Sequence, residues 1–168
     1  MWTRRTLHEC AWELESISDS FRSAYTNKIF LDEDQRQKIM HDTSIRGLEV
    51  LRILVLAIRS EQDAGTLLKY PAVVGALKND ASEEDAFFIL NHYEPPYKKL
   101  KAFHSLKLRE ALNKIAHADP VRSSFYADDK THDLILFGTY HNSMWIAVIS
   151  IIDLCLVIKC IPDRKIKS

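Results

Sequence analysis

The chain of 168 residues is 46% hydrophobic and carries 23 Lys and Arg residues against 23 Asp and Glu residues, so its formal net charge is zero. That balance argues against a protein that coats nucleic acid or binds a membrane surface through its overall charge, although it leaves room for a local basic patch. A chain of this length fits one domain that buries roughly 70% of the surface exposed by the unfolded chain, so it needs no metal or disulfide to fold.

A low content of chain breakers, four glycines and five prolines, favours long helices over a fold of strands and turns. Apolar residues recur every three or four positions over residues 6–25, which predicts a first helix there. Asp32 is suited to cap a second helix with acidic residues in its first turn, and we expect that helix over residues 33–62.

The middle of the chain alternates helix signals with breakers. Residues 65–79, interrupted by Pro71, are expected to form a shorter helical or irregular piece. Ser82 followed by Asp85 resembles a capping box and predicts a helix through Tyr93.

A long helix is expected next, over residues 96–118. Pro95 and Pro96 end the preceding helix, and Pro96 is suited to the first position of a new one. Asp119-Pro120 stops it.

The last third of the chain changes character. Residues 123–127 and 131–140 are rich in β-branched and aromatic residues around the turn-like Asp128-Asp129-Lys130, and predict a β-hairpin. A final helix over residues 144–160 is apolar nearly all round and should lie at the centre of the fold. Because residues 145–161 are short for a membrane span and include two charges, we predict a buried helix and no membrane contact.

Together these elements predict a mostly α-helical fold. We expect a bundle of about four to six helices with one β-hairpin between the helix over residues 96–118 and the last helix. Residues 1–161 should form a single helical domain, and residues 162–168 a frayed C-terminal tail.

The helix over residues 96–118 carries the functional signal. On a helical wheel, Arg109, Asn113 and His117 gather on one side, because they are four residues apart. A histidine can move a proton, an arginine can hold a phosphate fork-wise and an asparagine can orient either group, so these three are candidate catalytic residues for phosphate chemistry. The helix C-terminus favours the protonated form of His117. The alternative is that His117 and Asn113 only cap or pair within the bundle. The expected core face is Leu108, Ala111, Leu112, Ile115 and Ala118.

A second seam on the same helix points to an oligomer. Its members follow a three-four spacing and comprise Phe103, Leu106, Glu110, Asn113 and His117. A helix with two packing faces usually contacts two neighbouring elements, and a homodimer would supply the second one.

One local basic patch lies in this region, with Tyr97 and Phe103 interleaved. Contact with RNA is the functional interpretation, with Lys101, Lys107 and Lys114 as binding residues. The alternative is a solvated helix face. The patch comprises Lys98, Lys99, Lys101, His104, Lys107, Arg109 and Lys114.

His132 and His141 flank the second predicted strand and have Asp128, Asp129 and Asp133 nearby. Because no ligand spacing among them is diagnostic of a metal site, we interpret them as polar residues on the surface of the hairpin.

The stretch Leu108-Arg109-Glu110-Ala111-Leu112-Asn113-Lys114-Ile115-Ala116-His117-Ala118 resembles the motif helix of HEPN proteins (higher eukaryotes and prokaryotes nucleotide-binding). The hairpin and the apolar final helix with Trp145 are similar to what some bacterial and phage-borne members carry after the motif. The resemblance implies a helical bundle and a metal-independent endoribonuclease of a bacterial or phage conflict system, whose dimer brings two motifs together.

By this resemblance, His117 takes the position of the motif histidine and Asn113 that of the motif polar residue. The position of the motif arginine is Leu112, and Arg109, with seven residues between it and His117, is the nearest arginine. Two functional hypotheses follow. The first is an endoribonuclease that uses Arg109, Asn113 and His117; the second is a non-catalytic module of the same fold that binds RNA, a nucleotide or a protein partner.

Overall fold

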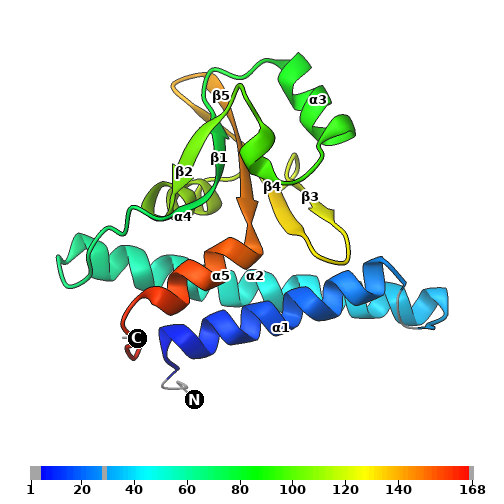
Figure 1. Ribbon diagram of the computed structural model, residues 1–168, viewed down its shortest axis with the longest axis horizontal. Coiled ribbons are helices and arrows are strands. Elements are labelled where there is room, and N and C mark those ends of the chain that lie inside the picture. Colours follow the sequence, from blue (N-terminus) through cyan, green and yellow to red (C-terminus); the bar gives the residue numbers. More distant parts are fainter. Residues whose placement is uncertain (1–4, 28–29, 167–168) are drawn as a thin grey trace. The chain divides into compact units, whose positions relative to one another are not determined.

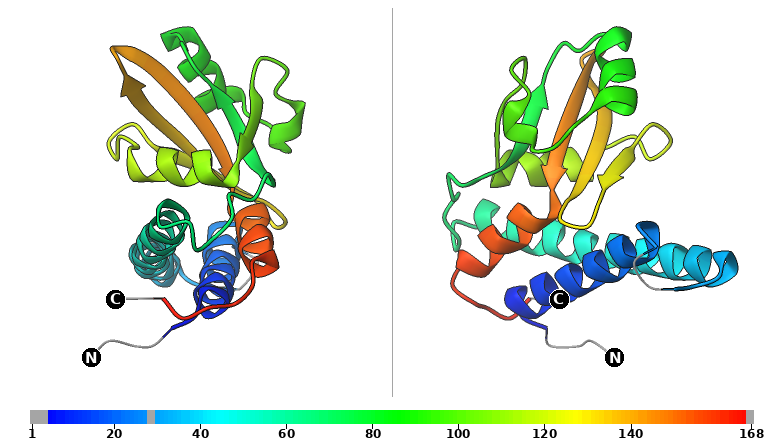
Figure 2. Two further views of the ribbon diagram at one scale, coloured as in Figure 1. Left: turned by 90° about the vertical axis from the view of Figure 1, so that its left-hand side faces the viewer. Right: turned by 45° about the vertical axis from the view of Figure 1, so that its right-hand side comes forward.

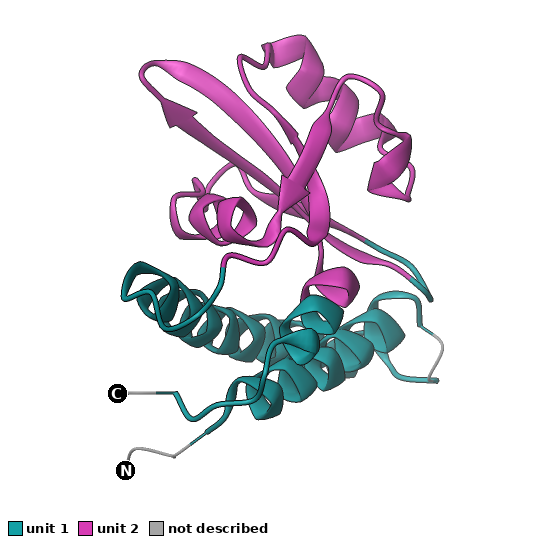
Figure 3. Ribbon diagram, turned by 60° about the vertical axis from the view of Figure 1, so that its left-hand side comes forward, with its two compact units in different colours: residues 1–68, 127–130, 155–168 teal, residues 69–126, 131–154 magenta. Residues whose placement is uncertain are grey.

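The computed structural model describes residues 5–27 and 30–166, which belong to two compact units (Figures 1 and 3). Unit 1 comprises residues 1–68, 127–130 and 155–168, and unit 2 comprises residues 69–126 and 131–154. In the described part of the chain, five α-helices accompany a five-stranded antiparallel sheet. The fold is therefore α+β, and the prediction of a mostly α-helical bundle with one β-hairpin is wrong.

Two long helices dominate unit 1, α1 (Leu7–Tyr25) and α2 (Glu33–Asp63), and they pack side by side (Figures 1 and 2). The Thr6 hydroxyl accepts the Glu9 N–H while the Glu9 carboxylate accepts the Thr6 N–H, so a capping box starts α1. The Asp32 carboxylate accepts the Gln35 N–H at 2.8 Å and starts α2. Both predicted helices are confirmed, because local caps and an amphipathic pattern define them.

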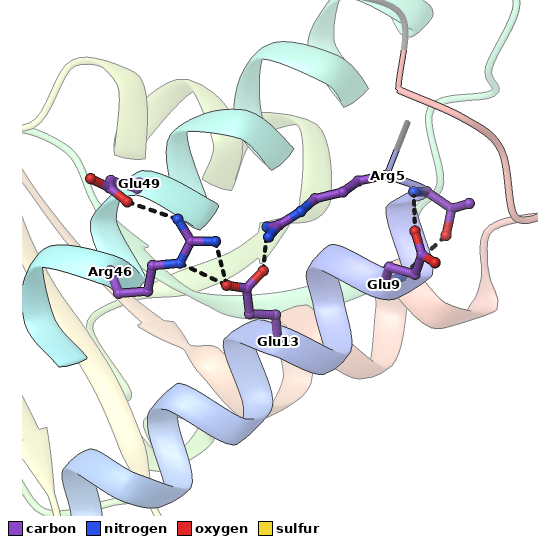
Figure 4. A network of polar contacts seen from close by, with 6 residues as sticks. Arg5, Glu9, Glu13, Arg46 and Glu49 are labelled. Carbon is purple, nitrogen blue, oxygen red and sulfur yellow. Dashed lines mark hydrogen bonds and ion pairs between the residues drawn. The ribbon is translucent and has the colours of Figure 1, made fainter. Parts of the chain in front are cut away.

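An ionic network ties the first turns of α1 to the middle of α2 (Figure 4). The Glu13 carboxylate bridges the Arg5 and Arg46 guanidinium groups. Nε of Arg46 donates to Glu13 Oε1 at 2.7 Å, and Nη1 donates to Glu49 Oε2 at 2.9 Å. Hydrogen bonds to Glu49 and Glu13 raise the pKa of Arg46, so its charge is permanent in this setting.

The C-terminal residues lie along the N-terminal segment within unit 1. The Leu7 N–H donates to the Arg164 carbonyl at 3.0 Å, and the Ile166 N–H donates to the Arg5 carbonyl at 2.9 Å. The Arg164 guanidinium pairs with Glu61 at 3.1 Å. Of the predicted frayed tail, residues 167 and 168 lie outside the described residues.

The three cysteines are free thiols. Cys10 and Cys155 are buried, and burial raises the pKa of Cys155 to about 12. Cys160 is exposed.

Unit 2 is built on the sheet, whose strand order is β2-β1-β5-β4-β3. The outermost strands in this order are β2 and β3, and β5 lies in the middle. The predicted hairpin is confirmed as β3 and β4. The strand bounds are β1 Val73–Lys78, β2 His104–Lys107, β3 Ser124–Ala127, β4 His132–Tyr140 and β5 Ser143–Ser150.

The predicted final helix is half wrong. Residues 143–150 form the central strand β5, and only α5 (Ile151–Cys160) is helical. An uninterrupted apolar run suits a buried helix and a strand buried on both faces equally well, so periodicity does not separate them. No helix in the described part of the chain is long and apolar enough to cross a membrane.

The predicted helical or irregular piece at residues 65–79 contains β1 instead. This strand pairs with β5 on one side, with Ala76 opposite Val148, and with β2 on the other side. Four consecutive buried residues, Val74–Leu77, lack the polar alternation that marks a half-exposed strand.

Each face of the sheet is covered by a different helix (Figure 2). On one face, α3 (Glu83–His92) and the 3-10 turn η1 (Tyr97–Lys99) contribute Ala86, Ile89, Tyr93 and Tyr97 to a cluster with inward residues of β1, β4 and β5. On the other face, α4 (Leu108–Ala116) contacts β1, β2, β4 and β5. Alternation along β5 divides its side chains between the two faces.

Two buried tyrosine hydroxyls donate to carboxylates on the α3 side of unit 2. Tyr93 donates to Asp133 Oδ2 at 2.6 Å, and Tyr97 donates to Asp153 Oδ2 at 2.7 Å. Burial, and then the neighbouring carboxylate, raises the pKa of each phenol well above its ordinary value. Both tyrosines therefore stay protonated in the folded chain when they would ionise in the unfolded chain.

These tyrosines predict a loss of stability at high pH. Because the pKa is higher in the folded state, their contribution is complete below about pH 10 and decreases as the pH rises, by about 1.4 kcal/mol per pH unit for each phenol. Urea unfolding of Tyr97→Phe between neutral pH and pH 11 should show a shallower decrease than the wild type. Parallel curves would contradict the raised pKa of Tyr97.

Candidate functional site

The helix that carries Arg109 and Asn113 is much shorter than predicted. Residues 96–118 contain η1, a turn, β2 and only then α4, which begins at Leu108 and ends at Ala116. The Leu108 N–H donates to the Ala72 carbonyl at 3.0 Å, so the first residue of α4 is tied to the residue that precedes β1. The prediction of one long helix is wrong, because residues 104–107 pair with β1 instead of continuing a helix.

This correction also removes the predicted oligomer seam. Leu106 is fully buried in β2, and Phe103 lies in the preceding turn, where it packs on the cluster under α3. Neither residue shares a helix face with Asn113. A homodimer through the motif helix therefore loses the pattern that suggested it.

The core face of α4 follows the prediction in part. Leu108, Ala111 and Leu112 are buried, whereas Ile115 and Ala118 are half-buried. Leu112 occupies the position of the motif arginine in the HEPN resemblance, and it is 0% exposed. Packing therefore requires an apolar side chain here, since a guanidinium buried without a partner is very costly.

The three predicted catalytic residues lie along one edge of α4. Arg109 and Asn113 are half-buried, and His117 is exposed. His117 caps the helix, and its N–H donates to the carbonyls of Asn113 at 3.1 Å and Lys114 at 3.3 Å. At 1.5 Å per residue, Arg109 and His117 are about 12 Å apart along the axis, so one chain does not gather both around a single phosphate.

Asn113 has the least satisfied polar atom of this site. Its side-chain oxygen is buried, and no hydrogen-bond donor among the described residues reaches it. A buried acceptor without a donor costs about 1–3 kcal/mol, which folding alone does not explain.

Lys114, a predicted binding residue, is engaged by an aromatic ring. Its ammonium nitrogen lies 4.5 Å from the centroid of the buried Trp145 ring, and burial lowers its pKa. The indole covers Gly138, the cross-strand partner of Trp145, where an added Cβ would come within 2.1 Å of Trp145 Cζ2. The predicted helix over residues 144–160 hides this arrangement; a Gly opposite a Trp in adjacent strands is the signal that indicates it.

The remaining cations form an exposed strip that we call the basic edge. It follows η1 and the edge strand β2, and each member is exposed. Residues 95–109 contain no Asp or Glu. Of the described residues, none forms an ion pair with these side chains, although the Lys98 ammonium lies 5.9 Å from the Tyr97 ring centroid. The basic edge comprises Lys98, Lys99, Lys101, His104 and Lys107.

Two acidic residues of unit 2 pair with cations outside the basic edge. Asp85 pairs with Lys78 at 2.6 Å, and Glu83 pairs with Arg122 at 2.9 Å. Tyr97, predicted to interleave with the patch, is buried and donates to Asp153, so its ring does not offer a stacking surface. The basic edge therefore presents His104 as its exposed ring.

The histidines of the predicted hairpin do not converge. His132 begins β4 and packs edge-on against Phe125, whereas His141 follows the end of β4 and packs against Tyr140. A nine-residue strand separates them by about 30 Å, at roughly 3.3 Å per residue. In residues 5–27 and 30–166, no group of three or more His, Cys, Asp or Glu residues is placed to hold a metal ion.

Comparison with known proteins adds no relative. No protein-family model matches the chain, and neither a curated protein nor a solved structure matches it.

Because the side-chain oxygen of Asn113 has no donor, we predict that this residue lowers the stability of the fold. Asn113→Leu keeps a similar shape and removes the buried acceptor, so the free energy of unfolding should rise by about 1 kcal/mol. Asn113→Asp should lower it, because a carboxylate near the C-terminal end of α4 opposes the helix dipole. Denaturant unfolding measures both, and a loss of stability in Asn113→Leu would mean that the amide is structural.

Proposed function

We propose that this chain binds RNA through the basic edge and the adjoining start of α4. The observation that carries the proposal is the set of five exposed cationic or titratable side chains along η1 and β2, without one acidic residue between Pro95 and Arg109. A nucleic-acid backbone is the ligand that binds more tightly to several unpaired cations along one line, because each phosphate that a cation neutralises releases counterions.

The layout favours a polyanion over a single nucleotide. The cations extend along a turn and an edge strand, whereas a nucleotide site gathers its ligands around one or two phosphates. The outer side of β2 also has backbone N–H groups without a strand partner, and these can donate to phosphate oxygens. Arg109, which follows Lys107 by two residues, extends the same surface onto α4.

The resemblance of residues 108–118 to the HEPN motif helix points to the same ligand class, and we retain it as part of the proposal. The free thiols Cys10, Cys155 and Cys160 favour a reducing compartment, so we propose a cytoplasmic site of action. Lys114 is left out of the RNA surface, because its ammonium lies over the Trp145 ring.

The RNA-binding proposal is tested by removing two lysines of the basic edge. Lys101→Ala/Lys107→Ala should weaken binding of a single-stranded RNA roughly tenfold at low salt. It should also reduce the slope of log K against log salt by about 1.4, since each phosphate contact contributes about 0.7. Fluorescence anisotropy over a series of salt concentrations measures both quantities.

Lys69→Ala/Lys130→Ala is the matched control, because it removes the same charge from exposed positions outside the basic edge. It should bind like the wild type. Equal losses in the two double variants would mean that attraction is set by overall charge, and the basic edge would not be the site.

RNA cleavage is a second candidate function, favoured by the exposed imidazole of His117 one turn after Asn113, whose side-chain oxygen lacks a donor. His117 would take the proton of the 2′-hydroxyl as that oxygen forms a bond to the adjacent phosphorus. The bond from phosphorus to the 5′-oxygen would break, the leaving 5′-oxygen would take a proton from water, and Arg109 would stabilise the charge on the phosphate oxygens. Because Arg109 and His117 lie about 12 Å apart along α4, these two roles would fall to different copies of the chain.

Cleavage is tested by incubating labelled RNA with the purified chain in excess chelator. Cleavage should occur without metal and should fall at least a hundredfold in His117→Ala. RNA that stays intact with the wild type, while anisotropy still reports binding, would remove the catalytic candidate and keep the binding function.

A further inference from the structure

The outer face of α2 is apolar where a solvent-facing helix is usually polar. Its inward face buries Val50, Leu51, Leu54, Val55 and Ile58. On the opposite side, Ile45 is 48% exposed, Leu48 57%, Ile53 36% and Leu56 68%. At 100° per residue these four lie within one half of the helix circumference, so they form a stripe that we call the α2 stripe. A stripe of this kind marks an interaction surface.

The outer side of α2 also carries charged residues, which together with Ile45 and Leu56 have a regular spacing. Alternating steps of three and four residues are the spacing of a coiled-coil seam, in which two positions of each heptad face a partner helix. The positions on this seam are Lys38, Asp42, Ile45, Glu49, Arg52, Leu56, Arg59 and Asp63.

The seam is self-complementary when it is reversed about the midpoint between Val50 and Leu51. In an antiparallel pair of identical helices, positions equally distant from that midpoint lie in the same layer. Ile45 then meets Leu56, and Glu49 meets Arg52. These two central layers, each formed twice in the dimer, hold either two apolar residues or two opposite charges.

Other arrangements lack this match. A parallel pair would set Glu49 against Glu49 and Arg52 against Arg52 of the second copy. An antiparallel pair shifted by one heptad would set Ile45 against Glu49, or Arg52 against Leu56. Like charges and an apolar residue facing a charge both oppose association, so the seam specifies one register.

Glu49 is already oriented for this contact (Figure 4). Its Oε2 accepts from Arg46 at 2.9 Å, on the side of Arg46 away from Glu13. Within the part of the chain that the structure describes, no donor reaches Oε1. An arginine of a second copy can therefore bind Oε1 without displacing Arg46.

We propose that the α2 stripe is the interface of a homodimer in which α2 pairs antiparallel with α2 of a second copy. A lipid surface fits less well, because the seam carries both acidic and basic residues instead of basic residues at the rim of an apolar face. The interface lies within unit 1 and does not depend on the RNA-binding proposal, whose residues lie in unit 2.

A complementary pair of charge reversals tests the register. Glu49→Arg and Arg52→Glu each place two like-charged pairs in the homodimer, so each should weaken self-association roughly tenfold or more relative to the wild type. An equimolar mixture of the two variants restores both attractive pairs and should form a heterodimer with wild-type affinity. Sedimentation velocity over a wide range of concentration measures this, and a mixture of monomers would overturn the proposal.

If Glu49→Arg fails to fold, a second pair of variants tests the same interface without changing the Arg46 network. Ile45→Lys and Leu56→Glu each place a charge against an apolar residue, whereas their mixture has one ion pair and one apolar pair per dimer. The mixture should again associate more tightly than either variant alone. Glu84→Arg, a charge reversal on an exposed face of α3, is the matched control and should dimerise like the wild type.

A wild-type chain that stays monomeric at every concentration would also overturn the dimer. Lys101→Ala/Lys107→Ala should keep wild-type dimerisation while its RNA binding weakens. Conversely, a monomeric Ile45→Lys variant should still bind RNA. Failure of the dimer proposal can therefore be distinguished from failure of the RNA-binding proposal.

Discussion

The arrangement of unit 2 depends on one constraint, the burial of both faces of β5. Trp145 to Ile149 are five consecutive residues that are 0–3% exposed, and burial of each large side chain among them stabilises the fold by about 1.5–3 kcal/mol. A strand that hides both faces needs a neighbour on each edge and a layer on each side. β1 and β4 supply the edges, while α3 and α4 supply the layers. Most other features of the unit follow from that requirement.

The same constraint decides how the candidate site is presented. Because α4 is the layer on one face of the sheet, Leu112 must be apolar, and the polar residues of α4 are left along its edge. Because β1 needs a second neighbour, residues 104–107 become an edge strand, and the lysines around them become a line of exposed cations instead of one face of a long helix. The chemistry that this produces is a charged surface suited to a polyanion, with a histidine and an amide at one side of it.

Unit 1 follows a different principle, in which two long helices bury one face against each other and leave the other face available. The capping residues Thr6 and Asp32, and the Glu13 bridge between Arg5 and Arg46, define the two helices and tie them together. None of these contacts requires apolar residues on the outer side of α2. Ile45 and Leu56 are therefore better explained by association than by folding.

Local signals in the sequence were enough for α1, α2, α3 and the β3–β4 hairpin, because caps, amphipathic spacing and turn residues act within a few positions of one another. Arg109 and Asn113 lie on α4, and His117 is its C-cap. Tertiary structure alone decided the rest: residues 143–150 are a strand because β1 and β4 pair with them, and residues 104–107 are a strand because β1 has a free edge. An apolar run satisfies a helix and a buried strand equally in sequence, and only long-range hydrogen bonds between strands far apart in the chain separate the two.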